Sequence, residues 1–278
     1  MAGAIAACSS PSIPIPLAPP AAATVDGQPI TMAAYEARLK VTSARDPFAG
    51  MPEALPSPAP AQRLEDFTIE QLIRETIIQQ QAAQRGIKIS DHDVNLRITQ
   101  LEDAAGSASF SQALRRNGFS DQSFRDYERA LLMEVALLQA MARQRADNAA
   151  SALKAGQSFD AVVAKYNDDQ GTAGRHGDIG WLRPADLPEP SLASAVETLQ
   201  PGDVSGLVDT SRGFVIAKVL ERRADQVHLA VILILAPTVD MISAQGTPGW
   251  FTSFLTDQES ALRRDGKITI NVGTHAGS

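Results

Sequence analysis

The sequence is poor in the residues that usually carry covalent cross-links and metal centres. Among 278 residues there is one cysteine, Cys8, so no disulfide can form within the chain. Aromatic residues make up 5% of the chain, which predicts a mainly aliphatic core. No apolar run approaches the roughly 20 residues that a membrane-spanning helix needs. The histidines show no metal-ligand spacing and lie apart at His92, His176, His228 and His275. The sequence therefore predicts no metal site.

Clusters of residues with the same charge are also scarce in the sequence. The formal net charge is −7 and the sequence pI is about 5.1, and no basic cluster interrupts this balance, which argues against a nucleic-acid partner. The sequence contains neither a G-x-S-x-G motif nor a phosphate-binding glycine loop, and we expect no cofactor. Asp168, Asp169 and Asp178 lie close in sequence, but their spacing is not that of an EF-hand calcium loop.

The segment 156–223 is patterned like a small α/β unit. A helix with one apolar face begins at Ser158, and residues 167–180, rich in Asn, Asp, Gly and Thr, predict a loop. A second short helix follows, with Leu192 on its apolar side. After a Pro-Gly turn, residues 204–208 and 214–220 predict two strands.

Four pieces of this segment resemble a known family. They are GQSFDAVVAKYNDD, HGDIGW, LPEPSLASAVETLQPGDVSGLV and TSRGFVIAKVLERR, in the family's order and at its spacing. The segment is similar to the parvulin-type (PpiC or rotamase) peptidyl-prolyl cis-trans isomerase domain of extracytoplasmic foldases such as SurA and PrsA. The resemblance implies a four-stranded antiparallel sheet with helices.

The earlier part of the chain predicts a mostly helical domain. Residues 24–40 read as strand, Asp-Gly turn, strand and helix, with Thr31 as the helix cap. Residues 45–61 are rich in proline and predict a loop. Further helices are predicted by apolar periodicity, with ends marked by glycines and by the Ser90–Asp93 capping box. The pieces TVDGQPITMAAYEARLK and LIRETIIQQQAAQRGIKISDHDV resemble the SurA-like N-terminal domain.

The parvulin resemblance lacks its first strand at the expected place. The long helix that begins after Ser120 runs straight into the GQSF helix, whereas residues 227–235, apolar and β-branched, predict a buried strand after the last family strand. We favour a circular permutation in which this strand joins the preceding one by a hairpin. The alternative is that it opens a second, truncated parvulin repeat.

The chain's last elements are expected to complete the helical domain. Residues 250–264 predict a helix, and residues 267–272 alternate apolar and polar side chains like a half-buried strand. By resemblance this strand pairs with the N-terminal strand. The expected fold is therefore α+β. Its domains are a tail (1–23), a SurA-like helical domain (24–148, completed by 248–272) and a parvulin-like domain (149–237).

The resemblance also implies where an isomerase site would lie. The family's Cys/Asp position falls on Asp169, although an Asp in such a loop also caps helices or bonds its own backbone. The positions of the family's two histidines fall on Val215 and Val231. The substrate-binding positions of the family fall on Leu187, Leu192, Arg212 and Phe214. Both histidines are thus replaced by valine, and we interpret this as a preserved fold with an eroded catalytic centre.

The first residues carry a possible modification site. Ile5-Ala6-Ala7-Cys8 has the pattern of a lipobox, which would place an acyl anchor on Cys8 ahead of a Pro-rich spacer. The stretch before Cys8 has no Lys or Arg and is too short for a secretory signal. The alternatives are a start further upstream or a chance Ala-rich tail.

Two functions of different class follow from the sequence. The first is a peptidyl-prolyl isomerase acting on unfolded exported polypeptides. The second is a chaperone or peptide-binding lipoprotein that keeps the parvulin fold for binding alone, which the two valines favour. A third reading is a structural lipoprotein subunit. In the first two, the partners are unfolded or proline-containing polypeptides, and the expected location is extracytoplasmic, secreted or tethered to a bacterial membrane through Cys8.

Overall fold

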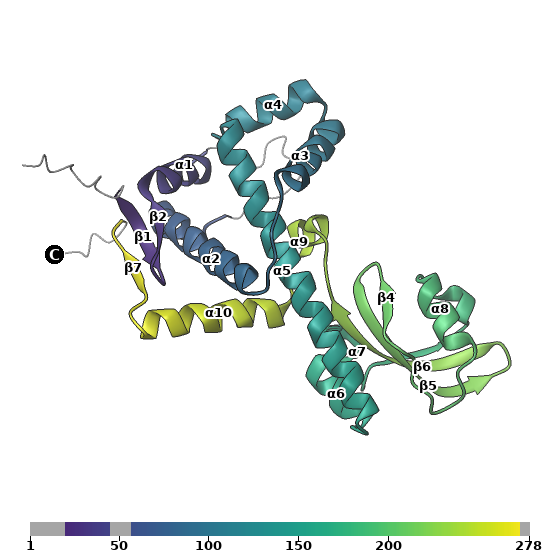
Figure 1. Cartoon of the computed structure of the whole chain (residues 1–278). Helices are drawn as coiled ribbons and strands as arrows, with labels where there is room; N and C mark the ends of the chain where they lie inside the picture. Colours follow the sequence, from purple (N-terminus) through teal and green to yellow (C-terminus); the bar gives the residue numbers. More distant parts are fainter. Residues whose placement is uncertain (1–19, 45–56, 273–278) are drawn as a thin grey trace, which may run out of the picture.

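A long helix, α5 (Asp121–Lys154), runs through the molecule and connects its two parts (Figure 1). The computed structural model describes residues 20–44 and 57–272. We call residues 142–236, which pack around a four-stranded sheet, the sheet domain, and the remaining described residues the helical domain. The first part of α5 packs on α2 in the helical domain, whereas its last turns pack on α6 and the sheet. The predicted α+β class is confirmed.

The helical domain is closed by a small sheet to which both ends of the described chain contribute. Its elements are β1 (Ala21–Val25), β2 (Gln28–Thr31), α1 (Met32–Thr42), α2 (Leu64–Gln84), α3 (Asp91–Ala105), α4 (Ser107–Arg116), the first part of α5, α9 (Val239–Gln245), α10 (Gly249–Arg264) and β7 (Ile268–Ile270). The strand order is β2-β1-β7, and β1 is antiparallel to both neighbours, with Ala23 opposite Ile30 and Ile270. The predicted return of the last strand to the N-terminal hairpin is confirmed.

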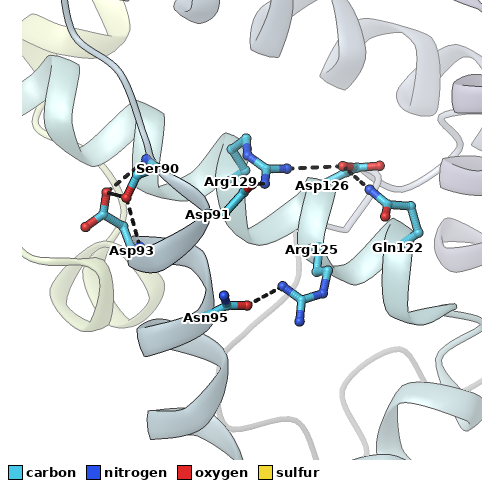
Figure 2. A network of polar contacts seen from close by, with 8 residues as sticks. All are labelled: Ser90, Asp91, Asp93, Asn95, Gln122, Arg125, Asp126 and Arg129. Carbon is cyan, nitrogen blue, oxygen red and sulfur yellow. Dashed lines mark hydrogen bonds and ion pairs between the residues drawn. The ribbon is translucent and has the colours of Figure 1, made fainter.

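Local capping explains where these helices begin. The Thr31 hydroxyl accepts a hydrogen bond from the Ala34 amide, as the sequence predicts. Ser90 and Asp93 form the predicted capping box, and the neighbouring Asp91 joins α3 to α5 by an ion pair with Arg129 at 2.6 Å (Figure 2). The starts of α1 and α3 are therefore specified by local sequence, whereas α2, α4 and α10 begin without a side-chain cap.

The helical domain has an aromatic cluster around Phe110, Phe124 and Tyr127, and a larger, mainly aliphatic core that is flanked by partly buried ion pairs between helices. Phe251 of α10 and Ile73 of α2 are both fully buried within it. Arg38 and Glu75 form a bidentate pair between α1 and α2, and Arg74 pairs with Glu134 of α5 at 3.2 Å. Within the described ranges, no helix is both long enough and apolar enough to cross a membrane.

The sheet domain has helices on both faces of one antiparallel sheet. Its elements are the last turns of α5, α6 (Phe159–Tyr166), α7 (Gln170–Ala173), β3 (Asp178–Leu182), a short 3-10 helix η1 (Pro184–Asp186), α8 (Pro190–Glu197), β4 (Val208–Thr210), β5 (Gly213–Arg223) and β6 (Gln226–Leu235). We call the side of the sheet covered by α5 and α6 the α5 face, and the side covered by α8 the α8 face (Figure 1).

Strand β6 occupies a central position in this sheet. The strand order is β3-β6-β5-β4, so the last strand of the domain in sequence lies between β3 and β5. It forms a hairpin with β5, in which Ala217 lies opposite Val231, and it pairs with β3 on its other edge. The strand therefore completes the sheet of this domain, as the permutation predicts, and does not open a second repeat.

Two local predictions were wrong. Residues 204–208 do not form a strand, because only Val204 bridges to β5 before the chain joins the sheet at β4. Residues 167–180 are not all loop, since α7 and the start of β3 fall within them. Trp181, in HGDIGW, is partly buried and stacks on His228 with ring centroids 5.1 Å apart.

Candidate functional site

The α8 face of the sheet brings together four of the residues that the sequence selected. Val215 of β5 and Val231 of β6 are 6% and 8% exposed and belong to one apolar cluster. Leu192 of α8 is buried in the same cluster, and the half-buried Leu187, which lies just before α8, packs against it. The family's proline-pocket and histidine positions therefore share one aliphatic surface.

Glycines allow the strands of this face to approach closely. At Gly177, in HGDIGW, a Cβ atom would lie 2.3 Å from the carbonyl oxygen of Val231, and φ is +80°. At Gly213, a Cβ atom would lie 2.3 Å from the Ile234 carbonyl oxygen, with φ at +135°. No side chain fits at such distances, so both motif glycines are required by the backbone of β6.

Polar contacts hold α8 over the sheet. Ser191 donates to the Asp209 carbonyl at 2.8 Å, and Glu189 accepts hydrogen bonds from the amide and hydroxyl of Ser211. At the other end of α8, Arg222 donates to three carbonyl groups in or just after the last turn, those of Val196, Glu197 and Leu199. The position of Leu192 is thus fixed from both ends of its helix.

Asp169 is placed as a helix cap. Its Oδ1 accepts from the Gly171 amide at 3.1 Å, and its Oδ2 accepts from the Thr172 hydroxyl at 2.8 Å. These contacts agree with the alternative interpretation, in which Asp169 caps a helix. Its assignment to catalysis stays a prediction.

The two residues before Asp169 have a role that sequence reasoning missed. Asn167 accepts from the Leu233 amide at 2.9 Å, and the Asp168 carboxylate accepts from the Leu235 amide at 2.9 Å. These side chains bond the edge of β6 beyond the end of β3, as a neighbouring strand would. Burial raises the pKa of Asp168, although the Leu235 amide and Arg145, 3.2 Å away, oppose this shift.

The structure separates two predicted residues from the others. Phe214 lies on the α5 face, where the Arg143 guanidinium stands 5.4 Å from its ring centroid. Phe214 lies on this face because it is next to Val215, and successive residues of a strand point to opposite faces. The sequence alone was enough to predict this separation. Arg212 is exposed in the turn before β5.

The described histidines lie away from the α8 face. His92 is at the start of α3, and His176 is exposed in the loop before β3. His228 is on β6, but its neighbours Val227 and Leu229 point to the α8 face, so its ring lies on the other side, 2.8 Å from Asp178. Burial of Asp178 is outweighed by hydrogen bonds from Gly180 and His228, which lower its pKa.

No metal-binding group was found within the described ranges: no three His, Cys, Asp or Glu side chains converge there. Cys8, the expected lipidation site, lies outside the described residues. The chemistry that the α8 face offers is therefore apolar contact.

Two family models match different parts of the chain. A model of the SurA-like N-terminal domain matches residues 15–138, and a model of the PPIC-type PPIASE domain matches residues 133–221. The chain combines a SurA-like N-terminal domain with a PPIC-type domain. The PPIC match ends before β6, so the strand that fills the centre of the sheet lies beyond it.

Relatives with curated names are chaperones. A Chaperone SurA from Nitrosospira multiformis is 27% identical over 64% of this chain and 53% of its own length. A Chaperone SurA from Alkalilimnicola ehrlichii is 34% identical over 30% of this chain and 19% of its own length. The chain spans about half the length, or less, of these relatives.

Two solved structures align with this chain at low sequence identity and low TM-score. The peptidylprolyl isomerase PrsA of Bacillus anthracis matches 74% of this chain and 99% of its own, at 16% identity and a TM-score of 0.28. A SurA-like chaperone structure from Campylobacter jejuni matches 91% of this chain and 99% of its own, at 14% identity and a TM-score of 0.30.

Proposed function

We propose that this protein is an extracytoplasmic folding factor of a bacterial cell envelope that binds unfolded, proline-containing polypeptides and has a weakened isomerase site. The pairing of a SurA-like domain with a PPIC-type domain supports a role in protein folding. The names of the relatives support chaperone activity.

The observation that carries the weakened site is the composition of the α8 face. Isomerisation of a prolyl bond must overcome a barrier of about 18–20 kcal/mol that comes from amide resonance. A catalyst lowers it by binding the twisted amide better than the planar one. Val215 and Val231 offer no hydrogen bond to a twisted amide, and no histidine of the described residues lies on this face. An apolar surface can still hold a proline ring, so we expect proline-containing polypeptides to bind although the two histidines are replaced by valine.

A membrane tether belongs to the same proposal. Cys8 would carry the acyl chain, and the Pro-rich residues after it would separate the folded part from the bilayer. We expect the protein to fractionate with membranes when expressed in its host, and Cys8→Ser to release it into the soluble envelope fraction. A protein that fractionates identically with and without Cys8 would contradict the tether.

The test of the isomerase is exchange NMR on Xaa-Pro peptides with the full chain. We expect little exchange above the uncatalysed rate from the unmodified protein. The variant Val215→His/Val231→His tests whether restoring the histidines restores exchange. Strong catalysis by the unmodified protein would show that the site is not weakened.

Binding is tested separately with the same peptides. Leu187→Ala removes an apolar side chain from the α8 face and should weaken binding of the proline peptide several-fold. Leu220→Ala removes a half-buried leucine that packs on the α5 face and serves as the matched control. If the peptide shifts no resonance near Leu187 or Leu192 at millimolar concentration, the α8 face is not a proline-binding surface.

A further inference from the structure

A groove on the opposite side of the sheet domain has no role in the function proposed above. It has a volume of about 780 Å³ and lies between the last turns of α5 and the segment 202–207, with Ile216 and Lys218 of β5 in its lining. Its size falls within the range of ligand-binding clefts. Because Lys218 lies on the α5 face, this groove is separate from the surface around Leu187 and Leu192.

One wall of the groove is an exposed edge of extended backbone. Segment 202–207 is held on β5 by hydrogen bonds from the Ser205 amide to the Ala217 carbonyl and from the Val219 amide to the Asp203 carbonyl, at 2.8 and 3.0 Å. This pattern makes Val204 and Lys218 a non-hydrogen-bonded antiparallel pair, so the N–H and C=O of Val204 point away from β5. Such outward groups are the template to which another strand can add.

The floor of the groove carries an unmatched positive charge. Lys218 is half-buried, and no carboxylate of the described residues lies within ion-pair distance of its Nζ, which stands 5.8 Å from the centroid of the Phe159 ring. Lys154 also lines the groove, in the last turn of α5. The lining contains one carboxylate, Asp147, which already pairs with Arg143 at 3.2 Å.

We propose that this groove binds an extended acidic polypeptide segment, which adds as a strand along Val204 and directs a carboxylate to Lys218. The outward backbone groups provide the main-chain contacts, and the charge of the floor selects acidic side chains over neutral or basic ones. Alternation along a strand places every second side chain over the same surface, so a peptide with acidic residues at every second position fits best. The proposal goes beyond the proposed function and does not depend on the proline-binding surface.

The experiment uses the full chain and fluorescence anisotropy of three labelled heptapeptides. In each, valine alternates with one other residue, which is glutamate, glutamine or lysine. We expect the glutamate peptide to bind about tenfold more tightly than the glutamine peptide, as one charge-assisted hydrogen bond predicts, and the lysine peptide to bind least. The preference should fall as salt is raised. Equal binding of the glutamate and glutamine peptides would overturn the proposal.

Charge variants test whether Lys218 is the contact. Lys218→Gln should remove the tenfold preference for glutamate, whereas Lys165→Gln, which deletes a lysine that also stands over an aromatic ring, should leave it unchanged. Lys218→Glu should reverse the preference towards the lysine peptide, provided that far-UV circular dichroism and the Tm stay those of the unmodified protein. A glutamate preference that survives both Lys218 substitutions would place the acidic segment elsewhere and overturn the proposal.

Discussion

The two domains differ in how far apart in sequence their core residues lie. The core of the helical domain joins β1, α2, α5 and α10, so side chains from both ends of the described chain meet in it. The sheet domain draws its two apolar clusters almost entirely from residues 142–236. The sheet domain is therefore a contiguous unit inserted into the helical domain, which needs α10 and β7 from the far end of the chain to complete its core. Trp250 packs against the cores of both domains and therefore links them.

The largest expected effect is the loss of an aromatic side chain from the helical core. Phe251→Ala should lower the free energy of unfolding of the helical domain by about 3–5 kcal/mol, because the ring is fully buried. Ile232→Ala, a matched change in the sheet domain, should cost about 2–5 kcal/mol there. Urea denaturation followed by tryptophan and by domain-resolved hydrogen exchange should show one transition shifting in each variant. If both transitions shift together in both variants, α5 makes the two domains one cooperative unit.

A smaller effect is expected from the motif glycines of the sheet domain. Gly177→Ala should cost about 3 kcal/mol, because its Cβ would meet the Val231 carbonyl oxygen and φ is positive. Gly180→Ala has a similar φ of +82° but open space around the new atom, so only the conformational cost of about 1 kcal/mol applies. Thermal unfolding of the two variants measures the difference. Equal losses would mean that β6 can move aside at Gly177.

Helix caps should give effects of about 1 kcal/mol and allow the domains to be compared directly. Ser90→Ala removes a cap reinforced by Asp93 in the helical domain, and Ser158→Ala removes an unreinforced cap of α6 in the sheet domain. We expect about 1 kcal/mol for the first and less for the second. Chemical denaturation of each variant measures the losses, and a larger loss at Ser158 would contradict the assignment of the capping box as the stronger cap.

The smallest effects concern pH, and two carboxyl groups, Glu134 in the helical domain and Asp178 in the sheet domain, should respond with opposite signs. Burial raises the pKa of Glu134 above 4.5 despite Arg74, so its proton is held more tightly in the folded state. Its contribution to stability therefore grows as pH falls through the raised pKa towards 4.5. Asp178 has its pKa lowered below 3.8, because hydrogen bonds outweigh burial, so its contribution is lost as pH falls below 3.8. Each slope is at most about 1.4 kcal/mol per pH unit, the limit for one proton.

The measurement is the free energy of unfolding against pH for Glu134→Gln and Asp178→Asn beside the unmodified protein. Subtracting each variant's curve isolates the contribution of one carboxyl group. If the contribution of Asp178 also grew as pH falls, burial rather than hydrogen bonding would control both groups.

Much of the fold could be predicted because it depends on local signals. The caps at Thr31 and Ser90 and the run of β-branched residues in β6 each specify an element from a few neighbours. The failures have a different cause. The Ser205 hydroxyl accepts a hydrogen bond from the Ala217 amide, in addition to the bond that the Ser205 backbone makes. Regular strand pairing is interrupted there, and only an isolated bridge between Val204 and Lys218 remains. A sequence pattern does not show which side-chain hydroxyl will compete with the backbone hydrogen bonds between two strands.

Long-range polar contacts in the candidate site were equally hidden. Asn167 and Asp168 read as loop residues, and their bonds to Leu233 and Leu235 join positions 66 and 67 residues apart in sequence. Only the closed sheet brings these groups together. The position of Val215 and Val231 on one face, by contrast, could be expected once the permuted strand was recognised, because family resemblance supplied the pairing.

Helix α5 also sets a phase relation between the two domains. Its 34 residues give a continuous rod of about 51 Å, since each residue adds about 1.5 Å and turns the chain by about 100°. One residue inserted between Leu138 and Ala142 would therefore rotate the sheet domain by more than a quarter turn relative to the helical domain. An insertion of about seven residues would restore the facing and only lengthen the rod. The number of residues in α5 therefore sets the direction in which the α8 face and the groove at Lys218 point relative to the helical domain. The chain that returns to the helical domain through α9 and α10 must be compatible with this orientation.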